Sequence, residues 1–444
     1  MEIVIIGGIA AGMSAAAKAK RMNKAANVTV IEKENYVSFG ACGLPYYLGG
    51  QFEDENEMFA RTPEQIKKAG IHLLLGCQAS KIDFSSKQVH VRELETKEEK
   101  VIPYDKLMLA TGAKPIIPRI DGANAGNVYT ITRLDRVREL KERLTDYRKI
   151  VVVGGGFIGI EVADRLASLG TDVRIIEAKP AIMSQTFDPE FSEKLKEAME
   201  KEGIHIHLEE HVDNFETSEE EVVSVQTNKG NYLADAVILA VGFRPNTELV
   251  SNDIETLENG AIRIDPFGRT SQKDVFAAGD CASIPHRLLG DHYLPLATGA
   301  NKMGRIVGIN LVAAETEMEK YVGTLGSSAI KAGAYEAAST GLTERMAEQY
   351  GFHCKTTCIE VANHSNYYTV QEKIMIKLVY DAKSFVLYGA QLFGKNETVL
   401  RATGLAAAIH GKLTTKELGF VDFAYAPPFS STWEAINVAA NTAK

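Results

Sequence analysis

Two stretches of the chain share one pattern of apolar runs and glycine turns. Residues 3–6 form an apolar run that passes into a glycine-rich turn, and residues 151–153 begin the same pattern again. Each turn is followed by a segment of helical length and then by a second apolar run, at residues 28–31 and 173–176. Short apolar runs bounded by glycines are typical of buried strands. We therefore predict one strand–turn–helix–strand unit that occurs twice.

A carboxylate follows the second strand of both units. Glu32 and Glu177 each come about 20 residues after the last glycine of the turn, the place of an acid that hydrogen-bonds a ribose hydroxyl. The glycines let backbone N–H groups and a helix N-terminus approach a pyrophosphate. Because all parts occur in order twice, we predict two dinucleotide sites, one that delivers electrons and one that receives them.

The two glycine turns differ in one position. The second turn satisfies the full G-x-G-x-x-G pattern with Gly154, Gly156 and Gly159. In the first turn Gly7 and Gly12 are present, but Ile9 takes the place of the second glycine. We still predict a dinucleotide there. In the second unit Glu177 favours a free ribose 2′-hydroxyl and hence NADH. The positive charge of Lys179 would weaken the repulsion between Glu177 and a 2′-phosphate. The choice between NADH and NADPH therefore stays open.

Composition narrows the class of protein. The 444 residues are too many for one core, and 45% hydrophobic with 24% charged residues is ordinary for a globular chain. A net charge of −9 disfavours nucleic acid and membrane surfaces as partners. No apolar run approaches the ~20 residues of a membrane helix. Five cysteines and an N-terminus without a signal-peptide pattern favour reduced thiols in the cytoplasm. The histidines form no ligand motif, so we expect no metal site.

Three further apolar runs end in a turn or an acid. Residues 107–112 and 236–242 each run from a strand into a glycine, and residues 275–280 are a strand that ends in Asp280. Asp280 either starts a turn or hydrogen-bonds the ribityl chain of a flavin, and its context favours the second. From about residue 323 strands alternate with one Ala-rich helix over residues 402–410. The predicted domains are a first dinucleotide-binding domain in two segments, 1–114 and 246–322, a second dinucleotide-binding domain, 115–245, and a C-terminal domain, 323–444.

Cys42 is the candidate for thiol chemistry. It lies in the segment 38–47, between glycines and shortly before Pro45. It is either a buried structural thiol, the common state of a free cysteine, or a thiolate at the start of a helix whose N-terminus lowers its pKa. The residues alone leave both interpretations open. The cysteines expected to be packing residues are Cys77, Cys281, Cys354 and Cys358.

Taken in order, these motifs resemble those of the pyridine nucleotide–disulfide oxidoreductases over essentially the whole chain. The resemblance implies an α/β fold with two Rossmann-like dinucleotide-binding domains plus a C-terminal α+β dimerisation domain. It implies FAD at the first turn and NADH or NADPH at the second. Most members carry a C-x₄-C redox pair, but Tyr47 stands five positions after Cys42. The chain therefore looks like the single-cysteine branch of NADH oxidases, NADH peroxidases and coenzyme A-disulfide reductases.

Two features look most like the coenzyme A-disulfide reductases. Ala10 and Ala11 stand in the first turn, where peroxidases and many oxidases have a histidine, and the cysteine segment reads S-F-x-x-C-G-L-P-Y. In these reductases two tyrosines from the partner subunit complete the site. Tyr367, or its neighbour Tyr368, and Tyr425 match those tyrosines. The resemblance thus implies a homodimer with active sites completed across the interface.

The resemblance also implies a reaction. NAD(P)H would pass hydride to FAD, and reduced flavin would cleave a mixed disulfide between Cys42 and coenzyme A. The Cys42 thiolate would then attack coenzyme A disulfide, with Tyr425 as the proton donor to the departing thiol. Phe157 matches an aromatic residue that covers the flavin until nicotinamide displaces it. The alternatives are an NADH oxidase or peroxidase, a polysulfide or coenzyme A-persulfide reductase, and a flavin-bound redox sensor.

The resemblance also assigns binding residues. Coenzyme A carries phosphates, so its site needs cations, and the Lys and Arg residues below are either those cations or solvated surface charges. A fused C-terminal rhodanese domain, present in some relatives, is expected to be absent. The implied cofactor-binding residues are Gly7, Gly8, Ala10, Ala11, Gly12, Glu32, Lys33, Thr111, Gly112, Asp280, Ala297, Gly154, Gly156, Phe157, Ile158, Gly159, Glu177, Lys179 and Gly242. The implied substrate-binding residues are Ser14, Lys18, Arg21, Ser38, Arg61, Lys68 and Asn301.

Overall fold

The computed structural model describes residues 1–250 and 252–444, and the chain forms two compact units. Residue 251, inside the predicted segment 246–322, lies outside the described residues. No helix of the described ranges combines the length and the apolar character that a membrane span requires. The boundaries of the predicted domains, which were given as four segments, remain predictions. The first unit combines residues 1–43, 53–115 and 243–324, and the second combines residues 44–52, 116–242 and 325–444.

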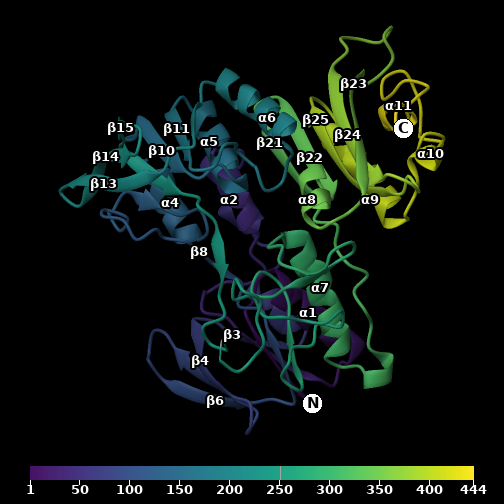
Figure 1. The fold of residues 1–444 in the computed structure, drawn as a ribbon. Helices are drawn as coiled ribbons and strands as arrows, with labels where there is room; N and C mark the ends of the chain where they lie inside the picture. The colour runs from purple at the N-terminus through teal and green to yellow at the C-terminus, as the bar shows by residue number, and fades with distance from the viewer. Residues whose placement is uncertain (251) are drawn as a thin grey trace. The chain divides into compact units, whose positions relative to one another are not determined.

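A five-stranded parallel sheet forms the centre of the first unit. Helices α1 and α7 lie side by side (Figure 1) because small residues let their backbones approach. A Cβ added to Gly304 would lie 2.4 Å from the carbonyl oxygen of Ala11, and one added to Gly308 would lie 2.5 Å from that of Ala15. The sheet, in spatial order, is β18 (Val275–Ala277), β7 (Lys106–Leu109), β1 (Glu2–Ile6), β2 (Asn27–Ile31) and β3 (Ile71–Leu74), and the helices are α1 (Ala10–Met22) and α7 (Ala297–Asn310).

Smaller elements complete the first unit. They comprise an antiparallel meander of β4 (Cys77–Asp83), β5 (Gln88–Glu93) and β6 (Glu99–Pro103), the pairs β8 (Ala113–Pro115) with β17 (Phe243–Pro245) and β19 (Ile284–His286) with β20 (Gly290–His292), helix α3 (Pro63–Lys68), and 3₁₀ turns at Ala41–Gly43, Glu55–Met58 and Glu315–Glu317.

The second unit contains a second parallel sheet and a meander of its own. The sheet, in spatial order, is β12 (His205–Leu208), β11 (Asp172–Glu177), β10 (Lys149–Val153), β16 (Ala236–Leu239) and β9 (Val128–Tyr129). The meander is β13 (Val212–Ser218), β14 (Glu221–Thr227) and β15 (Asn231–Leu233), and the helices are α2 (Leu44–Leu48), α4 (Leu134–Arg143), α5 (Phe157–Ser168) and α6 (Pro189–Lys201).

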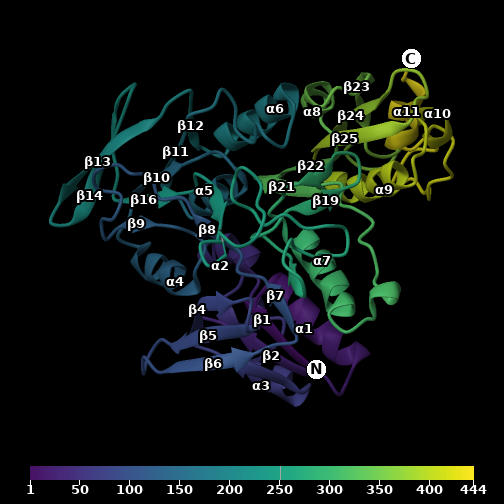
Figure 2. The same cartoon turned by 60° about the horizontal axis from the view of Figure 1, so that its bottom comes forward.

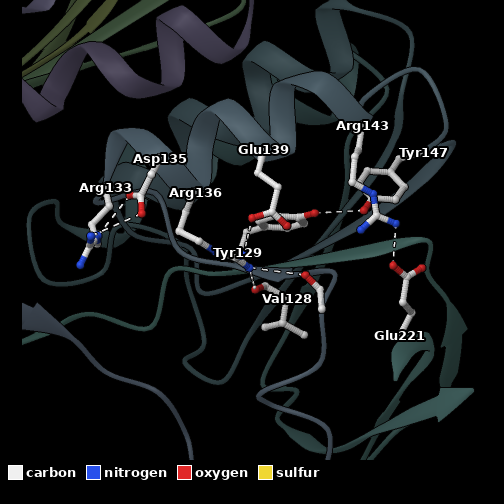
Figure 3. A network of polar contacts seen from close by, with 10 residues as sticks. Val128, Tyr129, Arg133, Asp135, Arg136, Glu139, Arg143, Tyr147 and Glu221 are labelled. Carbon is white, nitrogen blue, oxygen red and sulfur yellow. Dashed lines mark hydrogen bonds and ion pairs between the residues drawn. The ribbon is translucent and has the colours of Figure 1, made fainter. Parts of the chain in front are cut away.

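Polar contacts hold α4 against the rest of the second unit (Figure 3). Arg136 and Arg143 of this helix lie over the rings of Tyr129 and Tyr147, at 4.9 and 5.0 Å from the ring centroids. The two tyrosine hydroxyls are 3.1 Å apart, and Arg143 also donates to Glu221 at 2.6 Å. Cation–π contacts with buried tyrosines hold the helix while its charged heads stay near solvent.

The rest of the second unit is an antiparallel sheet with helices, as the fold prediction requires. Helix α9 packs on β22 and β25 (Figure 2). The predicted helix 402–410 is confirmed, although it begins earlier, but the expectation of one helix after residue 323 is wrong. Three helices of seven residues or fewer were missed because so short a segment shows no clear period. The elements are β21 (Ser328–Ala332), β22 (Tyr335–Gly341), β25 (Leu387–Gly394), β24 (Lys373–Asp381), β23 (Cys354–Ala362), α8 (Glu344–Gln349), α9 (Thr398–His410), α10 (Thr415–Leu418) and α11 (Ala435–Asn441).

A buried ion cluster joins this antiparallel sheet to helix α6. The ammonium of Lys377 lies 3.0 Å from Asp188, 2.5 Å from Glu190 and 2.6 Å from Glu344. The side chains of Lys377 and Asp188 are 5% and 2% exposed. Burial alone would raise the pKa of Asp188, but hydrogen bonds from Gln391 and Lys377 outweigh it and lower that pKa. Burial likewise opposes the charge of Lys377, yet its three carboxylate partners raise its pKa.

Lys377→Met is expected to lower the free energy of unfolding by about 3 kcal/mol or more, because it leaves the buried Asp188 carboxylate uncompensated. The matched control is Lys196→Met on α6, whose ion pairs with Glu193 and Glu200 lie at the surface. The control is expected to cost about 1 kcal/mol or less. Denaturant unfolding of the three proteins measures the effect, and equal losses in both variants would contradict the assignment.

The pH dependence gives a second readout of the same cluster. A lowered carboxylate pKa stabilises the fold above the ordinary value of 3.8 and loses this effect as the pH falls through the folded value. A raised lysine pKa stabilises the fold below 10.5 and loses this effect as the pH rises through the folded value. The difference between wild type and Lys377→Met should therefore be constant near neutrality and shrink in strong acid and strong base.

Candidate active site

The first glycine turn is a point of very close backbone approach. Gly7 has a φ of +108° and donates its N–H to the carbonyl of Ile31 at 2.9 Å. A Cβ on Gly7 would lie 2.0 Å from the carbonyl oxygen of Ala110, and one on Gly12 would lie 1.8 Å from that of Gly7. No side chain fits at such distances. The turn thus brings β1, β7 and the start of α1 together.

The second turn repeats this geometry. Gly154 has a φ of +107° and donates to the carbonyl of Ile176 at 2.8 Å. A Cβ on Gly154 would lie 2.4 Å from the Ala240 oxygen, and one on Gly159 would lie 2.0 Å from the Gly154 oxygen. The predicted repetition of one strand–turn–helix–strand unit is confirmed.

The middle glycine of the pattern has a different role. A Cβ on Gly156 would meet no atom within 4 Å, so the fold does not require glycine there. This explains why Ile9 is tolerated as the residue before α1. Glycine at the corresponding place in the second turn leaves room for a ligand rather than for the protein backbone.

The two predicted ribose acids accept hydrogen bonds from their own turns. Glu32 accepts the N–H groups of Gly8 at 2.7 Å and Glu34 at 3.0 Å. Glu177 accepts those of Gly155 at 2.7 Å and Lys179 at 2.8 Å. Burial raises the pKa of Glu32 despite these bonds. Each carboxylate is therefore fixed at a strand end, with lone pairs left for a ribose hydroxyl.

The donor set at the helix starts suits an anionic dinucleotide. Neither α1 nor α5 has a side-chain cap or an acid in its first turn, whereas Thr62 caps α3 and Thr414 caps α10. Unpaired N–H groups at a helix start favour a phosphate. α7, which begins at Ala297, also lacks a side-chain cap. Among the described residues none donates to the carboxylate of half-buried Asp280, whose pKa burial raises. These residues fit the diphosphate and polyol of FAD.

Asn246 is hydrogen-bonded to the turn at Thr111, a contact that the sequence pattern did not predict. The Thr111 hydroxyl donates to the Asn246 carbonyl at 2.6 Å, and the Asn246 side chain donates to the Thr111 carbonyl at 3.1 Å. The Asn246 N–H also donates to Gly112, whose φ is +69°. Gly242, with a φ of +103°, accepts from Ile116 at 2.9 Å. The predicted turns at Gly112 and Gly242 therefore both have the positive φ that glycine permits.

Cys42 is exposed, which excludes the buried structural thiol. It lies in the 3₁₀ turn Ala41–Gly43 directly before α2, the position that the second interpretation requires. Gly40 donates to the carbonyl of Met58 at 2.8 Å, and Ser38 donates to that of Gly8 at 3.0 Å. Ser38 also has a positive φ of +57°. The backbone before the cysteine is thus fastened to the first dinucleotide turn.

The segment after Cys42 contains a polar pair that the sequence did not predict. Tyr46 of α2 donates to Glu161 of α5 at 3.2 Å. Burial raises the pKa of both side chains, that of Tyr46 to about 12. The sequence signal was an acid one helical turn after Phe157, the first residue of α5. Phe157 and Ile158 are both half-buried at that helix start.

Tyr367 and Tyr425 lie together although 58 residues separate them. Their hydroxyls are 3.0 Å apart, and the side chains are 72% and 44% exposed. Their mutual hydrogen bond lowers the pKa of Tyr367 and raises that of Tyr425. Tyr368 instead packs its ring edge-on against His364. The geometry therefore pairs Tyr367, rather than Tyr368, with Tyr425.

Six of the seven predicted substrate residues fall into two groups, and the seventh, Ser38, lies in the segment before Cys42. Ser14 of α1 donates to Asn301 of α7 at 2.8 Å, and Asn301 donates to the carbonyl of Ala297 at 2.9 Å. Lys18 and Arg21 continue the Ser14 face of α1 at helical spacing. The second group lies at the two ends of α3, where both side chains are exposed. It comprises Arg61 and Lys68.

Other expectations have mixed outcomes. Cys77 and Cys281 are buried as expected, but Cys358 is exposed, so its assignment as a packing residue is wrong. Lys33 is exposed and paired with Glu34 at 3.8 Å. Among the residues that the structure describes, a group of three acids close enough to one another to hold a cation surrounds the ammonium of Lys377. They are Asp188, Glu190 and Glu344.

Comparisons with known proteins agree with this geometry. The chain is 32% identical to an NADH oxidase of Enterococcus faecalis, over 100% of this chain and 99% of that protein. It is 35% identical to an NAD(P)H coenzyme A polysulfide/persulfide reductase of Pyrococcus horikoshii, over 100% of this chain and 98% of that protein. It superposes on the reduced form of Bacillus anthracis CoADR-RHD with a TM-score of 0.95 and 29% identity, covering 99% of this chain and 79% of that one.

Two family models match the chain. The model "Pyridine nucleotide-disulphide oxidoreductase" matches residues 1–304, and the model of its dimerisation domain matches residues 327–436. The predicted fold class and the predicted FAD and NAD(P)H cofactors are thereby confirmed. The chain is a flavin-dependent NAD(P)H oxidoreductase and belongs to the pyridine nucleotide-disulphide oxidoreductase family.

Proposed function

We propose that this chain reduces coenzyme A disulfide to two thiols with NAD(P)H, through a mixed disulfide on Cys42. The observation that carries the proposal is an exposed cysteine in a turn fastened to the first dinucleotide site, with buried Tyr47 where most of the family has a second cysteine. A relative that acts on coenzyme A persulfide by its name, 35% identical over the whole chain, supports a coenzyme A substrate.

Two thiol steps make up the proposed reaction. The Cys42 thiolate attacks one sulfur of the disulfide, forms the mixed disulfide and releases one coenzyme A thiolate. Two electrons and one proton then convert the mixed disulfide into the Cys42 thiolate and a second thiol. Bound FAD would carry these electrons from NAD(P)H to the sulfur. In this scheme coenzyme A takes the part of the missing second cysteine.

A proton donor suits the departing thiolate, whose pKa is about 8.5. We propose Tyr425, because a phenol with an ordinary pKa of about 10 is protonated near neutral pH and its hydroxyl lies 3.0 Å from that of Tyr367. The match to a dimerisation domain over residues 327–436 includes both tyrosines. We propose that they serve the Cys42 of the partner subunit in a homodimer.

Cations for the phosphates of coenzyme A would come from α1. Lys18 and Arg21 share a face with Ser14, which contacts Asn301 of α7. A flexible ammonium and a forked guanidinium on one helix face can bind a phosphate monoester and a pyrophosphate together. Arg61 and Lys68, at the ends of α3, are the further proposed contacts.

Two other activities on this scaffold are the competing candidates. Relatives named as a persulfide reductase and as an NADH oxidase match the chain at 35% and 32% identity. Ala10 and Ala11 leave the first turn without an imidazole for oxygen–oxygen chemistry. NAD(P)H consumption with coenzyme A disulfide, coenzyme A persulfide, oxygen and peroxide should be compared side by side. A kcat/KM for another acceptor above that for the disulfide would overturn the proposal.

Cys42→Ser should lower disulfide reduction at least about a hundredfold and leave flavin bound and reducible by NAD(P)H, because only the thiol steps use the cysteine. Cys358→Ser is the matched control, since this cysteine is also exposed, and it should retain activity. Steady-state turnover and anaerobic flavin bleaching separate the two steps. Wild-type turnover in Cys42→Ser would remove the cysteine from the mechanism.

Tyr425→Phe should slow disulfide reduction about a hundredfold while flavin reduction stays intact, because general acid catalysis contributes about that factor or more. Heterodimers of Tyr425→Phe and Cys42→Ser chains test the action in trans. One of the two sites then combines an intact cysteine with an intact tyrosine, so about half of the wild-type activity should return. Heterodimers no more active than the Tyr425→Phe homodimer would place the tyrosine beside the cysteine of its own subunit.

Glu177→Ala should shift the kcat/KM ratio toward NADPH by about tenfold, the value of one hydrogen bond to a charged group. The carboxylate is held at the strand end by Gly155 and Lys179, where it would accept a ribose hydroxyl and repel a 2′-phosphate. Glu197→Ala on α6, which removes an exposed carboxylate paired with Lys194, is the control. An unchanged ratio would show that Glu177 does not face the ribose.

A further inference from the structure

The loop that carries Glu177 is held from behind by the turn after β12. The N–H of Glu209 donates to the carbonyl of Lys179 at 3.1 Å, and the N–H of Glu210 donates to that of Glu177 at 3.1 Å. Glu209 has a φ of +52°, the left-handed conformation that aims both N–H groups at the loop. The position of the ribose acid therefore depends on the position of this turn.

The side chain of Glu210 anchors the turn in the interior. It is 2% exposed. One carboxylate oxygen accepts the hydroxyls of Thr227 at 2.5 Å and Tyr232 at 2.8 Å. The other lies 3.5 Å from Nδ1 of His207. Two strands of the meander and β12 thus supply donors to a single buried carboxylate.

Arg174 determines how His207 takes part in this anchor. A guanidinium only donates, so the Arg174 contact of 3.2 Å to Nε2 makes that nitrogen an acceptor. The proton of the neutral ring is then on Nδ1, which faces the Tyr232 hydroxyl at 3.2 Å as well as Glu210. Burial, and the nearby Arg174, lower the pKa of His207, and Glu210 opposes them. Polar contacts therefore connect Arg174 of β11, through the ring of His207, to the carboxylate of Glu210.

The first dinucleotide unit offers an internal comparison. There the N–H groups of Gly76 and Cys77 donate to the carbonyls of Glu34 and Glu32 at 3.2 and 3.0 Å. The same pair of backbone hydrogen bonds, called the clamp below, thus holds the strand-end acid in both units. Gly76, in the place of Glu209, also has a positive φ, +62°. The residue in the place of Glu210 is Cys77, a buried thiol without charge. An apolar anchor is therefore sufficient for the fold.

We propose that Glu210 is a positioning residue for the nucleotide, which fixes the Glu177 carboxylate for a 2′-hydroxyl before NADH arrives. Burial of a carboxylate is costly, and the comparison with Cys77 shows that the clamp does not need one. NAD(P)H binds and leaves in every cycle, so a loop ordered in advance lowers the entropy lost at each binding event. The inference rests on the proposed ribose-binding role of Glu177, not on the identity of the disulfide.

Titration calorimetry of the FAD-loaded protein with NAD⁺ and with NADP⁺ tests the inference. Glu210→Ala should raise the Kd for NAD⁺ about tenfold, comparable to the loss of a charged hydrogen bond, with a much smaller change for NADP⁺. In a Glu177→Ala background the same substitution should add little, because Glu210 acts through Glu177. Equal weakening of both nucleotides, or the same factor in both backgrounds, would overturn the proposal.

Further variants keep the test decisive. Glu210→Gln retains an acceptor and should recover part of the affinity for NAD⁺. If Glu210→Ala does not fold, Thr227→Val and Tyr232→Phe each remove one donor and should shift the NAD⁺/NADP⁺ ratio in the same direction. Glu197→Ala, which removes an exposed carboxylate paired with Lys194 on α6, is the control and should leave both Kd values unchanged. If Glu177→Ala itself changes neither Kd, the assigned ribose contact fails rather than the anchor. Binding of oxidised nucleotides is independent of which acceptor the enzyme reduces.

Discussion

The contact between backbone atoms at Gly7 and Gly154 is the constraint on which both dinucleotide units depend. At each glycine the N–H is bonded to the neighbouring strand, and the missing Cβ would lie within 2.4 Å of a carbonyl on a third segment. A methyl group at either place would separate the strand from the connection that passes over it. The turn, the start of the helix and the acid at the next strand end would all move with it. The chemistry of the site therefore begins with a packing condition rather than with a polar contact.

The two units keep this condition and differ in what surrounds it. The first unit has Ile9 where the second has Gly156, and Cys77 where the second has Glu210. The second difference agrees with the role proposed for Glu210, because NAD(P)H must enter and leave in each cycle whereas FAD stays bound. A site for a diffusing ligand gains from a polar framework that holds the empty loop in place. One fold thus serves a resident and a transient dinucleotide.

The parts that sequence reasoning predicted are local. Glycine turns, strand-end acids and Cys42 are each defined within about 30 residues, a range in which spacing determines geometry. The parts it missed join distant segments. Glu161 contacts Tyr46 across 115 positions and Asn246 clips Thr111 across 135. Lys377 of β24 becomes buried among acids at the starts of two helices, α6 and α8. Spacing along the sequence does not predict such pairs, because only the tertiary fold brings the residues together.

Tyr47, at the position where most of the family has a second cysteine, is built into the packing of the second unit. Tyr47 is 7% exposed; its ring lies 5.8 Å from that of Phe52 and 4.0 Å from the ammonium of Lys141, which also donates to its carbonyl at 2.9 Å. The position has become part of the packing of α2 against α4. A cysteine there would leave a cavity and a lysine without its ring. Under the proposed function, the resolving thiol would come from the substrate disulfide, which would supply one in each turnover.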